Sequence, residues 1–170
     1  IKLIGAAIDQ CAGISGAIDT PQLIADRLVP PLQLESIIRY TSDGKDIDAL
    51  SNYFTQLAIL VKDTLISGVL PVVVGGDHSC AIGTWSGVAA YFASRGQTLG
   101  LIWIDAHMDA HTPETTLSGN LHGMPLAVLL GHGYTSLVNI LTNNPKLKPE
   151  NVVLIGIRSH EEDEMLLLQQ

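Results

Sequence analysis

The sequence predicts an α/β fold in which a mostly parallel sheet is covered by helices on both faces, a three-layer α/β/α arrangement. Four short, β-branched and almost continuously apolar runs alternate with stretches that have helical character. Such alternation is typical of βαβ units and a parallel sheet. Charged residues make up only 15% of the chain, which favours strands that are buried on both faces.

Each element is predicted from a local pattern. The strands are the apolar runs at residues 1–8, 69–74, 99–104 and 152–157. The helices are predicted at residues 46–67, 81–94 and 125–130 from apolar spacing near 3.6 residues or from a terminating glycine. A further helix is expected to begin at Glu161. Residues 9–21 and 110–123 are predicted loops, and a loop as long and polar as the second is usually functional.

Length, charge and cysteine content exclude several classes of function. A length of 170 residues suits one domain, residues 1–170. The net charge of −8 argues against a nucleic acid or an anionic membrane as partner, and it favours a cationic substrate or a metal ion. No apolar run approaches the ~20 residues of a membrane span. Cys11 and Cys80 match no zinc or disulfide framework, so we expect a reducing, cytoplasmic location.

Acidic and imidazole side chains follow two of the predicted strands. Asp105, His107 and Asp109 alternate directly after one strand, and alternate side chains of an extended chain share a face. In open α/β sheets, ligands bind beyond the carboxyl ends of the strands. The predicted metal ligands are therefore His78, Asp105, His107 and Asp109. Carboxylates and imidazoles without a thiolate suit Mn²⁺, with Fe, Co or Ni as alternatives. Asp77 has a simpler alternative, as a turn or helix cap.

Three motifs stand in order along the chain. They are Gly75-Gly76-Asp77-His78-Ser79, Asp105-Ala106-His107-Met108-Asp109 and Ser118-Gly119-Asn120-Leu121-His122-Gly123. Together they resemble the ureohydrolase family, which contains arginase, agmatinase and formiminoglutamase. The resemblance implies a parallel sheet sandwiched by helices and a centre of two Mn²⁺ ions that hydrolyses a guanidino group. Within the family the chain looks most like arginase, which implies hydrolysis of L-arginine to ornithine and urea. Agmatinase and formiminoglutamase activities are the alternatives.

The resemblance also implies roles for single residues. The implied catalytic residues are His122, which matches the family's proton shuttle, and Asp109. The residues expected to bind the amino acid end of the substrate are His111, Ser118, Glu161 and Glu164. His111 stands where the usual arginase pattern has Asn, and a histidine can also donate a hydrogen bond. For Glu161 and Glu164 an acidic helix start explains the carboxylates equally well.

One motif of the family has no counterpart here, because no Asp-x-Asp segment follows the fourth predicted strand. We therefore expect an incomplete domain, truncated on its C-terminal side, that is inactive alone because two divalent cations repel without bridging carboxylates. The resemblance further implies a homo-oligomer. A non-catalytic module that binds a metal or ligand is the alternative from another class. A phosphoesterase is less favoured, since residues 110–123 contain no Lys or Arg for phosphate.

Overall fold

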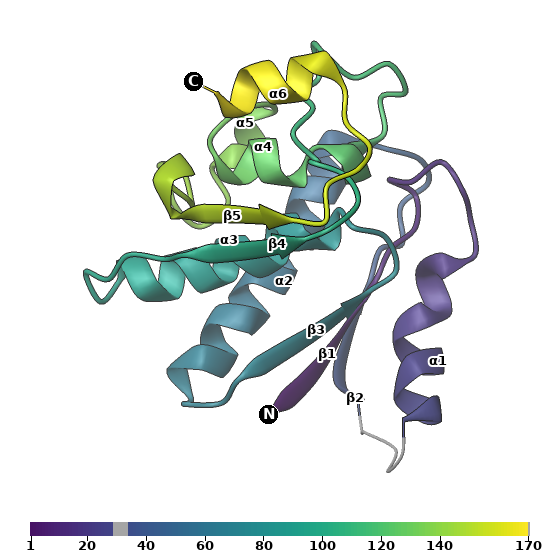
Figure 1. The fold of residues 1–170 in the computed structure, drawn as a ribbon. Helices are drawn as coiled ribbons and strands as arrows, with labels where there is room; N and C mark the ends of the chain where they lie inside the picture. The colour runs from purple at the N-terminus through teal and green to yellow at the C-terminus, as the bar shows by residue number, and fades with distance from the viewer. Residues whose placement is uncertain (29–33, 170) are drawn as a thin grey trace.

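The strands form two parallel sheets, with helices packed against them (Figure 1). The structure is a computed structural model, and it describes residues 1–28 and 34–169. The strands are β1 (Lys2–Ala7), β2 (Leu34–Arg39), β3 (Pro71–Gly75), β4 (Leu101–Ile104) and β5 (Val152–Ile155). The helices are α1 (Thr20–Arg27), α2 (Ile47–Ile66), α3 (Cys80–Ala93), α4 (Pro125–Leu129), α5 (Thr135–Val138) and α6 (Glu162–Leu168). Short 3-10 turns lie at Ala17–Asp19, Leu121–Gly123 and Pro149–Asn151.

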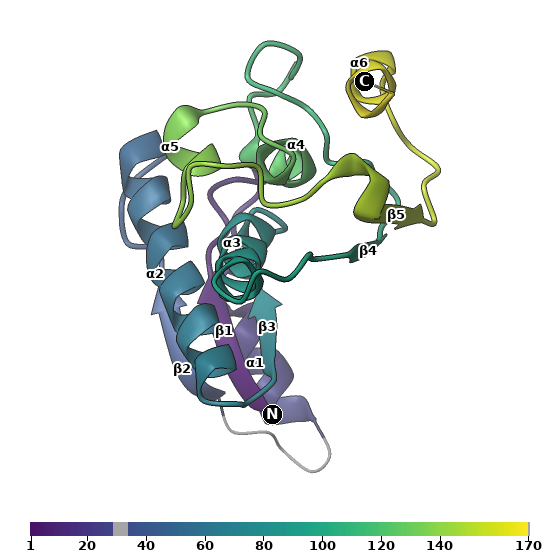
Figure 2. The ribbon, with the colours of Figure 1, turned by 90° about the vertical axis from the view of Figure 1, so that its left-hand side faces the viewer.

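The first sheet has the order β2-β1-β3 and is covered on both faces. Ile4 of β1 packs against Leu57 and Val61 of α2 on one face. On the other face α1 comes so close that a Cβ added at Gly5 would lie 3.0 Å from Cβ of Pro21. Figure 1 shows β1 between α1 on one side and α2 on the other, and Figure 2 views the sheet from the side of α2. The three-layer arrangement is therefore confirmed for this sheet.

The second sheet pairs β4 with β5, and it is covered on one face only by the described residues. Leu101 and Trp103 point into a cluster with α3 and α4. Ile102 and Ile104, which alternate with them, are 65% and 76% exposed. The expectation that these strands are buried on both faces is wrong here, because no described helix packs on their outer face. The expectation of one continuous sheet also fails, since β3 and β4 do not pair.

The longest helix follows its sequence signals closely. Asp46 caps α2 by accepting a hydrogen bond from the N–H of Asp48 at 3.1 Å. Gly68, with φ of 77°, ends the helix in a conformation that favours glycine. None of the helices in the described part of the chain is long and apolar enough to cross a membrane.

Two parts of the sheet region were not expected. Residues 9–21 were predicted as a loop, but their last residues form a 3-10 turn and the start of α1. Pro21 lies in the first turn of α1, where a helix needs no N–H from that residue. The edge strand β2 was not predicted either, because its partly buried and exposed positions alternate and it has no apolar run.

Candidate metal centre

The turn after β3 brings His78 to the carboxyl end of the first sheet. The N–H of Asp77 donates to the carbonyl of Ile8 at 2.9 Å, which ties the turn to the end of β1. The Asp77 carboxylate accepts hydrogen bonds from the N–H groups of Cys11, at 3.0 Å, and Ser79, at 2.9 Å. Asp77 therefore holds the turn, as its simpler alternative proposed. Gly76 lets the turn approach β1, because a Cβ there would lie 2.1 Å from the Ile8 oxygen.

Three of the predicted metal ligands converge at this point. His78 Nδ1 lies 2.8 Å from Asp109 Oδ2 and 3.2 Å from Asp105 Oδ2. One ligand atom from each of the three residues lies within 4.8 Å of the other two. Asp109 Oδ2 is buried and accepts no well-aligned hydrogen bond from the described residues. Carboxylate oxygens and an imidazole nitrogen are thus gathered at one point, and these are the donors of a site for a divalent cation such as Mn²⁺.

His107, the fourth predicted ligand, lies beside this cluster. Its Nδ1 is 3.3 Å from Asp105 Oδ1, and its side chain is 63% exposed. Its backbone N–H also donates to Asp105 Oδ1, at 2.9 Å. All four residues line one pocket of about 460 Å³. The structure thus gathers His78, Asp105 and Asp109, and it places His107 at the edge of the same pocket.

The surroundings of His78 favour its charged form. Burial alone would lower the pKa of His78, but the carboxylates of Asp109 and Asp105 outweigh burial and raise the pKa above its ordinary value. The indole of Trp103 stacks on the imidazole, with ring centroids 4.8 Å apart. Sequence reasoning missed Trp103. Trp103 lies two residues before Asp105, so the two side chains share a face of an extended chain, and this spacing could have indicated that Trp103 lies beside the site.

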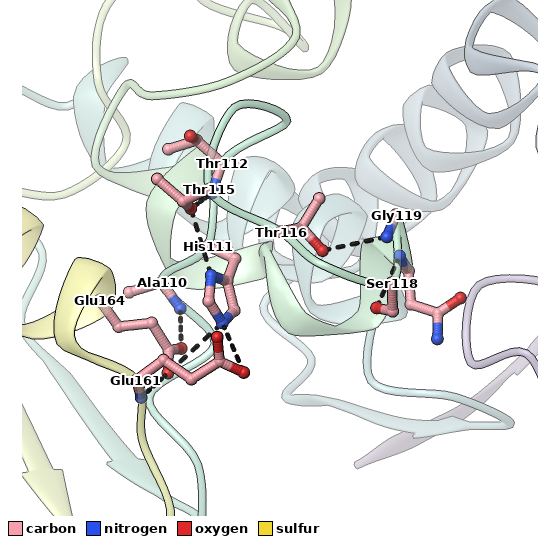
Figure 3. A network of polar contacts seen from close by, with 10 residues as sticks. Ala110, His111, Thr112, Thr115, Thr116, Ser118, Gly119, Glu161 and Glu164 are labelled. Atoms are coloured by element: carbon pink, nitrogen blue, oxygen red, sulfur yellow. Dashed lines mark hydrogen bonds and ion pairs between the residues drawn. The ribbon is translucent and has the colours of Figure 1, made fainter.

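The residues predicted to bind the amino acid end of a substrate line the same pocket (Figure 3). His111 Nε2 lies 3.6 Å from Glu161 Oε1 and 3.7 Å from Glu164 Oε2. The Ser118 hydroxyl accepts a hydrogen bond from the N–H of Asn120 at 3.2 Å. The lining contains four carboxylates and no Lys or Arg, so the pocket suits a cation.

His122 also lines the pocket, and its ring is held from behind. Its Nδ1 lies 2.9 Å from the carbonyl oxygen of Cys11. A carbonyl only accepts hydrogen bonds, so Nδ1 is the protonated nitrogen of the neutral ring. Nε2 is then the nitrogen that can take up a proton. A histidine in this state can transfer protons.

Asn120 is a lining residue to which sequence reasoning gave no role of its own. Lys45 donates a hydrogen bond from Nζ to Asn120 Oδ1. A Cβ added at Gly13 would lie 3.2 Å from Asn120 Nδ2. Asn120 belongs to the motif at residues 118–123. Its partner Lys45 lies 75 residues away in the sequence, so no local pattern could indicate this hydrogen bond.

Known proteins resemble this chain over its whole length. The arginase family profile matches residues 1–170. The arginase of Bacillus caldovelox is 46% identical over 126 residues, which is 74% of this chain and 41% of that protein. The arginase of Bacillus subtilis (strain 168) is 44% identical over 140 residues, 82% of this chain and 46% of that protein. The chain thus spans less than half the length of these curated relatives.

Solved structures agree with these matches. The crystal structure of arginase from Bacillus subtilis superposes with a TM-score of 0.85 at 38% identity, over 99% of this chain and 59% of that chain. Arginase from Entamoeba histolytica in complex with L-ornithine has a TM-score of 0.85 at 26% identity, over 99% of this chain and 61% of that chain. The profile match, the sequence identity and the shared fold lead to one conclusion: the chain belongs to the arginase family.

Proposed function

We propose that this chain carries the metal-binding and substrate-binding part of a manganese-dependent enzyme that hydrolyses the guanidino group of L-arginine to ornithine and urea. The observation that carries the proposal is a cluster in which ligand atoms of His78, Asp105 and Asp109 lie within 4.8 Å of one another. It faces a pocket whose lining is acidic and has no Lys or Arg. Membership of the arginase family supports this activity.

His78, Asp105 and Asp109 are the proposed metal ligands, and His107 is proposed as a further ligand from the edge of the pocket. When bound, a pair of Mn²⁺ ions would lower the pKa of a shared water enough to supply hydroxide at neutral pH. The ligand set has no thiolate, which agrees with Mn²⁺ rather than structural zinc. Asp109 is proposed to share in catalysis because its buried oxygen faces the reacting region.

His122 is proposed to transfer a proton to the leaving amine. Its Nδ1–H is fixed on the Cys11 carbonyl at 2.9 Å, so Nε2 is the basic nitrogen on a ring that cannot turn freely. An amine leaves only when it is protonated, so a positioned acid is required.

The other end of the pocket is proposed to bind the amino acid end of the substrate. Glu161 would pair with an α-amino group, and His111 and Ser118 would donate hydrogen bonds to a carboxylate. Glu161 is half exposed and close to His111, so it can reach a ligand. Agmatine has no carboxylate and would leave these donors without a partner.

The test is urea release by the protein at its full natural length, loaded with Mn²⁺, with arginine and agmatine compared. Losing a buried polar partner costs ~1–3 kcal/mol, so arginine should be preferred about tenfold or more. Ser118→Ala should lower arginine use more than agmatine use, while Ser94→Ala, on an exposed site at the end of α3, should change neither. Equal use of both substrates contradicts the assignment. Manganese binding without urea release would instead favour a non-catalytic binding module.

We also propose that residues 1–170 alone do not turn over arginine. The converging ligands carry two carboxylates, and two divalent ions held close together repel strongly in a site of low dielectric. The second ion should therefore bind weakly. Turnover by the 170-residue chain at a rate comparable to that of a longer arginase would contradict this proposal.

A further inference from the structure

The peptide group that joins Asp109 to Ala110 is held on both sides by distant parts of the chain. Its carbonyl oxygen accepts a hydrogen bond from the N–H of Leu126, at the start of α4, at 2.9 Å. Its N–H donates to Glu164 Oε1, in α6, at 3.1 Å. Figure 3 shows the Glu164 carboxylate beside the N–H of Ala110. The loop after β4 is thereby fixed to two helices.

This anchoring lies next to an uncommon backbone conformation. Asp109 has φ of 52°, in the left-handed region that L residues seldom adopt, although Asp tolerates it better than most. Such a conformation persists where its surroundings determine it. Because the Asp109 side chain branches from the Cα beside the anchored peptide, the anchor also determines where its carboxylate points.

Glu164 is buried, with a side-chain exposure of 5%. Its second oxygen accepts a hydrogen bond from the N–H of Glu161 at 3.0 Å, which closes the start of α6. Both oxygens of Glu164 are thus occupied by backbone N–H groups. The Glu164 carboxylate therefore holds the backbone at two points, and its Oε2 also lies 3.7 Å from His111 Nε2.

We propose that Glu164 is a positioning residue for Asp109: its buried carboxylate holds the 109–110 peptide so that the Asp109 carboxylate faces His78 and Asp105. The inference rests on the metal centre in the proposed function. It differs from the substrate contact that the sequence predicted for Glu164. Since residues that orient metal ligands typically contribute 10–100-fold to affinity, roughly that loss is expected without Glu164.

The experiment compares Glu164→Gln with Glu162→Gln in the 170-residue chain. A glutamine has one acceptor oxygen, so it can serve only one of the two N–H groups. Glu162 is exposed in the same helical turn, so its variant removes an equal charge from the helix start. Two quantities are measured: the affinity for Mn²⁺ alone, by calorimetry, and hydrogen exchange of the Ala110 amide, by NMR.

Glu164→Gln should weaken Mn²⁺ binding about 10–100-fold and speed exchange at Ala110, while Glu162→Gln changes neither. In an Asp109→Asn background the same Glu164→Gln change should cost less than about threefold, because contacting residues that act through one another are not additive. A general loss of structure would reduce affinity equally in both backgrounds. That result, or identical behaviour of the two glutamine variants, overturns the proposal.

Two further outcomes are also decisive. If Glu164→Gln does not fold, hydrogen exchange is measured in the unaltered chain instead. The Ala110 amide should exchange at least about tenfold more slowly than the amide of Leu117, a residue of the same loop that is 90% exposed. Equal rates overturn the proposal. If the unaltered chain binds no Mn²⁺, the proposed metal centre fails, and the exchange comparison still supports or overturns the hold of Glu164 on the 109–110 peptide.

Discussion

Replacing Gly76 with alanine should move the turn that carries His78 away from the end of β1. A Cβ at residue 76 would lie 2.1 Å from the carbonyl oxygen of Ile8 and 2.7 Å from that of Ala17. Both obstacles are backbone atoms. The N–H of Gly76 donates a hydrogen bond to the carbonyl oxygen of Ala6 at 3.0 Å, so the turn cannot withdraw without losing hydrogen bonds to β1.

The size of the effect follows from these distances. Ordinary contacts of a Cβ begin at 3.4 Å, so the turn has to shift by at least about 1 Å, and overpacking of this kind typically costs ~1–3 kcal/mol. Metal–ligand distances tolerate errors of only about 0.2 Å. A shift of His78 by several times that distance should weaken Mn²⁺ binding by about tenfold or more.

Denaturant unfolding and calorimetric Mn²⁺ titration of Gly76→Ala test both effects. Gly100→Ala is the matched control, because a Cβ there would meet only the Asn151 oxygen at an ordinary 3.6 Å. The control should lie within about 0.5 kcal/mol of the unaltered chain, as surface substitutions usually do. If Gly76→Ala matches the control in stability and in Mn²⁺ affinity, the close approach of the turn to β1 does not position His78.

Three other predictions concern single side chains. His122→Asn should keep Mn²⁺ binding while lowering urea release at neutral pH about 10²–10⁴-fold; near-normal turnover would remove His122 from proton transfer. His78→Ala should weaken Mn²⁺ binding more than His107→Ala in calorimetry, because His78 lies inside the ligand cluster, and equal losses would argue against the geometry. Burial lowers the pKa of Lys146 from 10.5 to about 8, so between these pH values the unfolded chain binds more protons and the free energy of unfolding should rise with pH. Denaturant titrations should show that rise, and Lys146→Met should abolish it; a rise that survives the substitution has another origin.

The fold was predictable where the signals are local. The apolar runs of β1 and β3 and the amphipathic pattern of α2, with Asp46 before it and Gly68 after it, each depend on neighbouring residues. The edge strand β2 was missed because an edge strand alternates in polarity and resembles a loop. The separation into two sheets was missed because pairing of β3 with β4 depends on contacts between distant segments.

The sequence indicated which residues are candidate metal ligands, but not which of them lie together in the folded chain. Asp105, His107 and Asp109 were predicted as ligands because alternation after a strand brings side chains to one face, and His78 because parallel strands end at one edge. Alternation alone could not show that His107 lies outside the converging group. Strict alternation does not hold here, because residues 105–109 lie beyond the end of β4 and Asp109 has φ of 52°.

Asp77 and Glu164, which hold the segments that carry the proposed ligands, stood out in the sequence, but their backbone partners could not be predicted from it, for a physical reason. Asp77 accepts from the N–H of Cys11, 66 residues away, and Glu164 accepts from that of Ala110, 54 residues away. Nearly every residue type offers a backbone N–H, so the donor leaves no mark in the sequence. The acceptor resembles an ordinary cap or an acidic helix start. A metal ligand must have a particular side chain, and it is therefore visible in the sequence. The support of that ligand needs only a carboxylate and a correctly placed peptide, and the correct placement exists only in the folded chain.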